Sequence, residues 1–169
     1  FKPGDDVPPG NLSFQDAQAF CRWLNSKSIQ AGSRRLYFRL PLAAEWEYAC
    51  RAGTTAPWYF GEEVSQLEEN LTPLHQVTTH AVKRFPPNPL GFFGFYGNDS
   101  EWCLDPANWP SPEHVRIDAD LVRRAEESVT TRRRKKGALF NSPRDHRRSA
   151  FGLAADCLLY TSDAADEVS

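Results

Sequence analysis

The most regular hydrophobic pattern in the chain runs from Arg39 to Thr54, with the sequence RLPLAAEWEYACRAGT. Apolar or small residues recur there at the spacing of one helical face, at Leu42, Trp46, Ala49, Cys50 and Gly53. Pro41 suits the first helical turn, because proline lacks the N–H that would stay unpaired there, and Gly53 suits the helix end. The pattern predicts an amphipathic helix with one buried face.

A second helix is predicted from about Phe14 to Lys27. Ser13 and Asp16 form a capping-box pattern at its start, and apolar residues at Ala17, Phe20, Cys21 and Leu24 follow at helical spacing. Elsewhere the pattern is weaker. It indicates short strands over 36–40 and 82–85 and a solvated helix over 118–129.

A run of five basic residues, Arg132–Lys136, would be able to contact nucleic acid. However, no aromatic residue interleaves the run, and Glu126 and Glu127 precede it. The net charge of the whole chain is only −2. The sequence therefore favours a solvated loop here and predicts no nucleic-acid partner.

Length and composition predict one globular, loop-rich domain. The chain has 169 residues, of which 40% are hydrophobic and 25% charged, with 13 Pro and 10 Gly. No apolar run approaches the roughly 20 residues of a membrane span, so no membrane partner is expected. The absence of Met predicts that the chain is part of a larger polypeptide.

The four cysteines are far apart in the sequence, at Cys21, Cys50, Cys103 and Cys157. Their spacing does not suit a zinc site. We expect buried free thiols, which behave as small hydrophobic groups, with one disulfide as the alternative.

Residues 97–105 form an oxygen-rich segment that follows three glycines spaced three apart among aromatics. Asn98, Asp99 and Glu101 carry side-chain oxygens, and Asp105 is near in sequence. Calcium takes about six to eight oxygen ligands, partly from backbone carbonyls, so such a loop is a candidate calcium site. The alternative is an Asx-type turn that stabilises itself.

Six segments carry a more specific signal. They are NLSFQDAQAFCRWL (11–24), FRLPLAAEWEYACRAGT (38–54), YFGEE (59–63), RFPPNPLGF (84–92), GNDSEWCLD (97–105) and FNSPRDHRRSAF (140–151). In motif, order and spacing they resemble the formylglycine-generating enzyme family, also called sulfatase-modifying factors. The resemblance implies an α+β fold of the irregular C-type-lectin-like kind, with two main helices, small antiparallel sheets and many loops. We expect a single domain over 1–157 that lacks the family's N-terminal part, and a non-native or disordered tail over 158–169.

The resemblance also implies calcium as a cofactor. One family site is built around the loop that matches Gly97, Asn98, Asp99 and Glu101. Asn70 and Leu71 match the pair that contributes to a second site.

Active family members are copper-dependent oxidases, which use molecular oxygen to convert a cysteine in a C-x-P-x-R segment of a sulfatase into formylglycine. Their Cu(I) is bound by two cysteine thiolates near the C-terminus, in keeping with the preference of Cu(I) for soft ligands. The matching positions here hold Ser142 and Arg147. The resemblance therefore implies that copper is not bound and that this chemistry is absent.

Further departures from the family pattern affect the scaffold. Leu42 stands in place of a capping threonine, and Ser100 in place of a large core aromatic, which is a cavity-forming change. Arg134 and Lys135 fall where the family has apolar strand residues.

Two functions follow. The first is a non-catalytic binding or scaffold domain that takes a protein or peptide ligand. The alternative is a formylglycine-generating oxidase that acts on a sulfatase.

Overall fold

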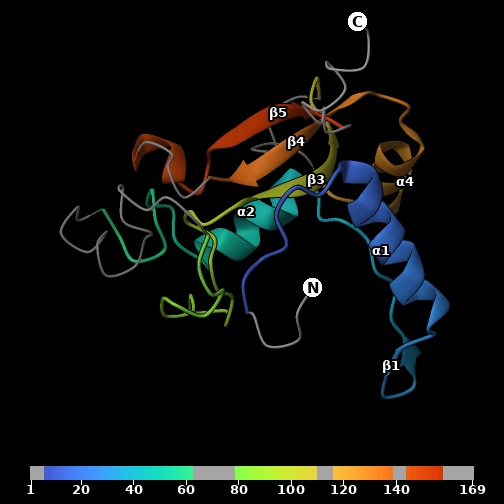
Figure 1. Ribbon diagram of the computed structural model, residues 1–169, viewed down its shortest axis with the longest axis horizontal. Helices are drawn as coiled ribbons and strands as arrows, with labels where there is room; N and C mark the ends of the chain where they lie inside the picture. The colour runs from blue at the N-terminus through green and yellow to red at the C-terminus, as the bar shows by residue number, and fades with distance from the viewer. Residues whose placement is uncertain (1–5, 63–78, 110–115, 139–143, 158–169) are drawn as a thin grey trace, which may run out of the picture.

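The computed structural model describes residues 6–62, 79–109, 116–138 and 144–157. Figure 1 shows α2 along one side of a three-stranded sheet and α1 projecting from the body of the protein. The helices and strands of the described part are α1 (Phe14–Ser26), β1 (Gln30–Ala31), β2 (Arg34–Arg35), α2 (Ala43–Arg51), β3 (Ser100–Pro106), α4 (Ala119–Glu127), β4 (Arg132–Gly137), the 3-10 helix η3 (Arg144–Arg147) and β5 (Gly152–Asp156).

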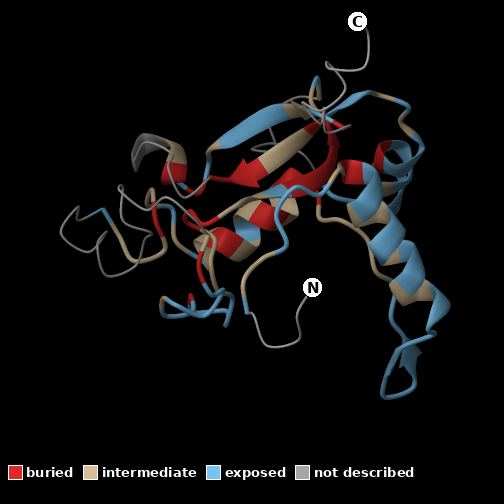
Figure 2. Cartoon of the chain, viewed as in Figure 1, coloured by how far each residue is buried: buried red, intermediate tan, exposed pale blue. Residues whose placement is uncertain are grey.

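Helix α1 begins at the predicted capping box. Asp16 N–H donates to Ser13 Oγ at 3.1 Å, and Ser13 N–H donates back to Asp16 Oδ2 at 3.0 Å. Only Phe14 of this helix is buried, and Phe20 and Trp23 lie exposed and stacked, with ring centroids 5.7 Å apart. The predicted helix is confirmed, but most of it projects from the core (Figure 2).

Helix α2 also follows the prediction, although it begins two residues after Pro41. Leu42 provides no side-chain cap, and the strand β3 supplies one instead: Ala43 N–H donates to Asp105 Oδ2 at 2.6 Å. The helix ends at Arg51, and the following residue, Ala52, adopts the left-handed conformation at φ 49° ahead of Gly53. A carboxylate distant in sequence thus replaces the cap that Leu42 lacks.

The main sheet has the order β3-β4-β5, with both pairs antiparallel, while β1 and β2 form a separate two-stranded hairpin. Successive side chains of β3 point to opposite faces of the sheet. Cys103 joins the core cluster of α2, whereas Trp102 and Leu104 join the cluster of α1 and α4. The sheet is therefore covered on both faces, and the buried residues gather in β3, β4 and α2 (Figure 2).

The basic run is the central strand β4, so the prediction of a solvated loop is wrong. Arg133 is only 2% exposed. Its Nη1 donates to the carbonyl oxygens of Leu104 and Ala125, the latter at 2.8 Å, and its guanidinium lies 4.7 Å from the centroid of the Phe14 ring. Backbone carbonyls at the end of α4 and in β3 thus accept hydrogen bonds from the guanidinium, which the sequence pattern had predicted to be solvated.

Two short strands that the sequence predicted, over 36–40 and 82–85, do not form. Residues 36–40 are extended but pair with a side chain: Phe38 N–H donates to Asn25 Oδ1, and Asn25 Nδ2 donates to the Phe38 carbonyl, both at 2.8 Å. Residues 82–85 form a turn in which Arg84 N–H donates to the Ala81 carbonyl at 3.1 Å. The side-chain amide of Asn25 thus makes the two hydrogen bonds that a neighbouring strand would otherwise make to the backbone of Phe38. Side-chain partners of this kind help to explain the low content of regular structure.

The predicted class, α+β with small antiparallel sheets and many loops, is confirmed, with three α-helices in the described part. The third, α4, begins at Asp118, whose side chain accepts from Leu121 N–H at 2.8 Å. It is not wholly solvated, because Leu121 and Ala125 are buried. In the described part, no helix has the length and apolar character needed to cross a membrane.

Candidate functional site

A cavity of about 870 Å³ lies beside the start of β3. Its wall is largely aromatic and proline-rich, with a small polar group at Asp99, Ser100, Glu101 and Lys135. The apolar lining includes Pro8, Pro9, Leu12, Pro41, Trp46, Phe92, Phe93, Phe95 and Trp102. A concave, mostly apolar surface with a few polar groups is the usual form of a ligand site. Ser100, which stands where the family resemblance implies a large aromatic, is part of this wall.

The oxygen-rich loop borders this cavity, and its asparagine is fully engaged by backbone. Asn98 adopts φ 78°, its Oδ1 accepts from His80 N–H at 2.8 Å, and its Nδ2 donates to the His80 carbonyl at 3.0 Å. His80 is itself buried. Asn98 thus joins the loop to the preceding segment, and its amide oxygen already accepts one hydrogen bond.

The two carboxylates of the loop are differently placed. Asp99 Oδ1 accepts from the N–H of the next residue, Ser100, at 2.7 Å, whereas the Asx-type turn that was the alternative to a metal site needs the N–H two residues on. Glu101 lies on the cavity wall, close to Gly137: a Cβ atom added at Gly137 would lie 2.6 Å from Glu101 Oε2. Glycine at 137, where φ is +74°, is therefore needed both for the backbone and for the carboxylate.

The surroundings of Glu101 favour its protonated form. Glu101 keeps exposed surface at the cavity wall, but its Oε2 lies close against Gly137 of β4, so the carboxyl group is partly desolvated. This desolvation raises the pKa of Glu101 well above its usual value, and the charge of Asp99 raises it further. The Trp46 side chain and the ammonium of Lys135 oppose the shift.

These donors do not by themselves make up a calcium site. Two carboxylates are available, one of which already accepts a hydrogen bond from the adjacent backbone N–H, whereas calcium takes about six to eight oxygens. Within the described residues, no three His, Cys, Asp or Glu side chains are grouped so that they could hold a metal ion. Asn70 and Leu71, assigned to a second site, lie outside the described residues. Calcium binding stays a prediction.

The positions matched to the copper-binding cysteines have no thiol. Ser142 lies outside the described residues. Arg147 closes η3 and is 2% exposed, and its backbone carbonyl accepts from Trp58 Nε1 at 3.0 Å. It is thus part of the packed interior beside Trp58.

All four cysteines of the chain are described, and all are free thiols, so the alternative of a disulfide does not hold in this structure. Cys50, Cys103 and Cys157 are buried, as expected, and Cys21 is half-buried. Desolvation is the main cause that raises the pKa of each thiol, to about 11 for Cys50. Cu(I) binds the thiolate form, so binding here would have to displace a proton that burial helps to retain.

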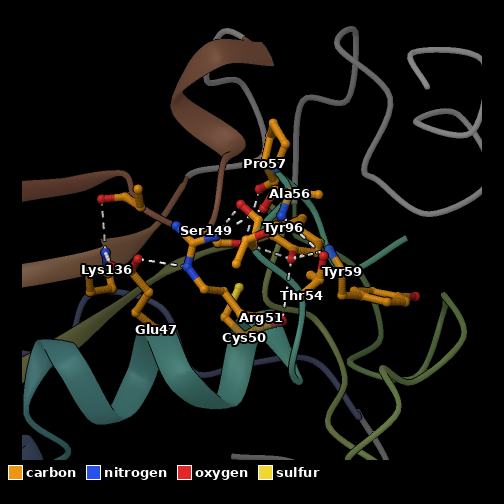
Figure 3. Close-up of polar contacts among 12 residues, drawn as sticks. Glu47, Cys50, Arg51, Thr54, Ala56, Pro57, Tyr59, Tyr96, Lys136 and Ser149 are labelled. Atoms are coloured by element: carbon orange, nitrogen blue, oxygen red, sulfur yellow. Dashed lines mark hydrogen bonds and ion pairs between the residues drawn. The ribbon is translucent and has the colours of Figure 1, made fainter. Parts of the chain in front are cut away.

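A polar network fixes the segment after η3 to α2 (Figure 3). Lys136 Nζ lies 3.1 Å from Glu47 Oε2 and donates to the Ala150 carbonyl at 3.0 Å. Glu47 also accepts from Arg51 Nε at 2.8 Å. The side chain of Lys136 is only 3% exposed, so this ion pair belongs to the interior.

A second group of hydroxyls lies at the other end of the network (Figure 3). Tyr96 OH and Ser149 Oγ are 2.9 Å apart, and Ser149 Oγ donates to the Pro57 carbonyl at 3.0 Å. Tyr59 N–H donates to Tyr96 OH at 2.8 Å. Burial raises the pKa of the Tyr96 hydroxyl, which keeps it protonated. These contacts join the segments that contain Pro57 and Tyr59, Tyr96, and Ser149 to one another.

Sequence reasoning assigned Gly97, Asn98, Asp99 and Glu101 to one site, and in the structure Asn98, Asp99 and Glu101 line the cavity, whereas Gly97 does not. Sequence reasoning missed Lys135 and the aromatic wall. Lys135 would have been found if the pairing of β3 with β4 had been known, because Lys135 is the cross-strand partner of Trp102 and such partners share a face of the sheet.

Comparison with known proteins identifies the family. The sulfatase-modifying factor enzyme 1-like domain matches residues 1–156. The chain therefore belongs to the sulfatase-modifying factor family, as the six sequence segments predicted.

Some relatives are named as formylglycine-generating enzymes and others as inactive forms of that enzyme. The formylglycine-generating enzyme of Thermomonospora curvata is 32% identical over 149 residues, which cover 78% of this chain and 44% of that protein. The inactive C-alpha-formylglycine-generating enzyme 2 of Mus musculus is 27% identical over 154 residues, which cover 82% of this chain and 45% of that protein. The chain thus spans less than half the length of these relatives.

Solved structures share the fold. PvdO from Pseudomonas aeruginosa superimposes with a TM-score of 0.69 at 22% identity, covering 93% of this chain and 59% of that chain. The Treponema denticola variable protein 1 gives a TM-score of 0.66 at 20% identity, covering 92% and 69%.

Proposed function

We propose that this chain is a non-catalytic binding domain of the sulfatase-modifying factor family. The observation that carries the proposal is the state of its cysteines. The two positions that the resemblance assigns to copper hold Ser142 and Arg147, and Arg147 is packed into the interior. All four thiols of the chain have a raised pKa, and three of them are buried. Family membership without a thiolate pair favours binding over oxidation.

The cavity at the start of β3 is the place that we assign to the ligand. Its aromatic and proline-rich wall can bury apolar side chains of a protein or peptide segment, and its polar end can orient them. A relative named as inactive supports the existence of non-catalytic members of the family.

The alternative is a formylglycine-generating oxidase. It is favoured by relatives of that name at 32% identity. Catalysis would require a copper site built from other residues than the matched positions.

The two functions are separated by an assay on a cysteine-containing C-x-P-x-R peptide, with copper and oxygen supplied. We expect no aldehyde product above the level of a protein-free control. The enzyme of Thermomonospora curvata, assayed alongside, checks that the conditions support the reaction. Conversion of the peptide by this chain would overturn the proposal.

A further inference from the structure

The outer half of α1 and the β1–β2 hairpin form an arm, residues 20–38, that projects from the body of the protein (Figure 1). Most of the arm is exposed (Figure 2). Its returning segment is fixed to the helix by the two hydrogen bonds between Asn25 and Phe38, and Leu36 N–H donates to the Ile29 carbonyl at 2.9 Å. The arm is thus an ordered part of the fold, and none of its residues lines the cavity at the start of β3.

Large aromatic side chains of the arm face solvent. Phe20 is 58% exposed, Trp23 52% and Tyr37 70%. The rings of Phe20 and Trp23 stack with their centroids 5.7 Å apart, and Lys27 Nζ lies 5.0 Å from the centroid of the Trp23 ring. Their spacing of three and four residues places these three side chains along one face of the helix. Aromatic area of this kind is stabilised when a partner covers it.

The charged side chains of the arm are all positive. No Asp or Glu occurs between Asp16 and Glu45, although the whole chain has 22 acidic and 20 basic residues. The exposed cations of the arm are Arg22, Lys27, Arg34 and Arg35. Within the described residues, none of these cations forms an ion pair. Glu126 of α4 approaches the arm at Tyr37, whose OH donates to Glu126 Oε1 at 3.1 Å. The arm therefore carries an excess of positive charge beside exposed aromatic rings.

We propose that the arm docks an acidic segment of a partner protein that also carries apolar side chains. Complementary charge draws such a segment to the cations, and the rings supply apolar area for it to cover. A second copy of the chain fits less well, because two arms in contact would bring like charges together. Single-stranded nucleic acid also fits less well, because stacked bases need free ring faces, and Phe20 and Lys27 approach the Trp23 ring from opposite ends of the helix. The inference concerns the arm alone and does not depend on the ligand of the cavity.

The test is the affinity of the chain for a fluorescein-labelled peptide of repeating Glu-Glu-Leu, measured by fluorescence anisotropy. The arm variant removes three exposed cations and combines Arg22→Gln, Lys27→Gln and Arg34→Gln. The matched control makes the same change in charge at exposed cations elsewhere and combines Lys83→Gln, Arg116→Gln and Arg132→Gln. We expect the arm variant to bind the peptide at least about tenfold more weakly than the wild type, and the control variant to stay within about twofold.

Trp23→Ala should weaken binding of the same peptide by about fivefold, because the indole no longer contributes apolar area. Binding to the wild type should also weaken as the salt concentration rises. The inference is overturned if the wild type does not bind the peptide, or if the control variant loses as much affinity as the arm variant. It is equally overturned if oligo-dT or phosphatidylserine vesicles bind more tightly than the peptide and lose that binding in the arm variant, because the arm would then be a nucleic-acid or membrane surface.

Discussion

Replacing Asp105 with alanine removes the side chain that caps α2. Ala43 is fully buried, and its N–H donates to Asp105 Oδ2 at 2.6 Å, while Leu42 supplies no cap of its own. The variant loses the cap and leaves a buried donor without its acceptor, which together cost about 2 kcal/mol of unfolding free energy. Asp105→Asn keeps an oxygen acceptor at the same place and should cost much less.

The pH dependence gives this prediction a second, independent readout. Burial raises the pKa of Asp105 above its ordinary value of 3.8. The folded state therefore holds the proton more tightly than the unfolded chain does, so the contribution of Asp105 is full below the unfolded-state pKa and is lost as pH rises through the folded-state pKa. Asp105→Asn does not titrate, so its stability relative to the wild type should increase between acidic and neutral pH.

Urea unfolding followed by tryptophan fluorescence measures both effects. Asp156→Ala, at an exposed carboxylate paired with the exposed Arg132, is the matched control and should change the unfolding free energy by less than about 1 kcal/mol. The reasoning is refuted if Asp105→Ala is as stable as the wild type. It is equally refuted if Asp105→Asn is destabilised as much as Asp105→Ala at neutral pH.

Two further predictions concern β4. Lys136→Met leaves Glu47, whose side chain is 14% exposed, with Arg51 as its remaining ion-pair partner. We expect a loss of roughly 1–3 kcal/mol in urea unfolding, and a loss below about 0.5 kcal/mol would contradict an interior ion pair. Gly137→Ala places a methyl group 2.6 Å from Glu101 Oε2 at a φ of +74°, so thermal unfolding should occur at a lower temperature. Adding Glu101→Ala should recover part of that loss by removing the clash but not the backbone strain, and full recovery would show that the φ angle costs nothing.

Local signals were sufficient for the helices. The Ser13–Asp16 capping box and the periodic apolar face of α2 are each contained within a few residues, and a helix was also predicted over 118–129, so the sequence located all three helices. The cap of α2 was not predictable in the same way. Asp105 is distant in the chain, and only the packing of β3 against α2 brings it to Ala43.

The basic strand shows where sequence reasoning fails. A run of Arg and Lys is usually solvated, but Arg133 finds backbone carbonyls at the end of α4 and in β3, and Lys136 finds Glu47. Their partners are set by tertiary structure, so composition gave the wrong environment. The family resemblance pointed the other way, because it placed strand residues at Arg134 and Lys135.

The candidate site was predictable in part. The oxygen-rich loop was located from its residues, but the engagement of Asn98 by the backbone of His80 depends on a contact across the fold. The cavity required the lead-in, α2, the glycine–aromatic segment and β4 to be placed together. No local pattern carries that information.

The central claim is that the chain keeps the family fold without the thiolate pair that binds copper. It is tested most directly by titrating the reduced protein with Cu(I) in competition with a colorimetric chelator, alongside Cys157→Ser. We expect the wild type and the variant to retain no stoichiometric Cu(I), because no cysteine stands at the matched positions and three of the four thiols are buried. Stoichiometric thiolate-bound Cu(I) in the wild type that is lost in Cys157→Ser would contradict the account.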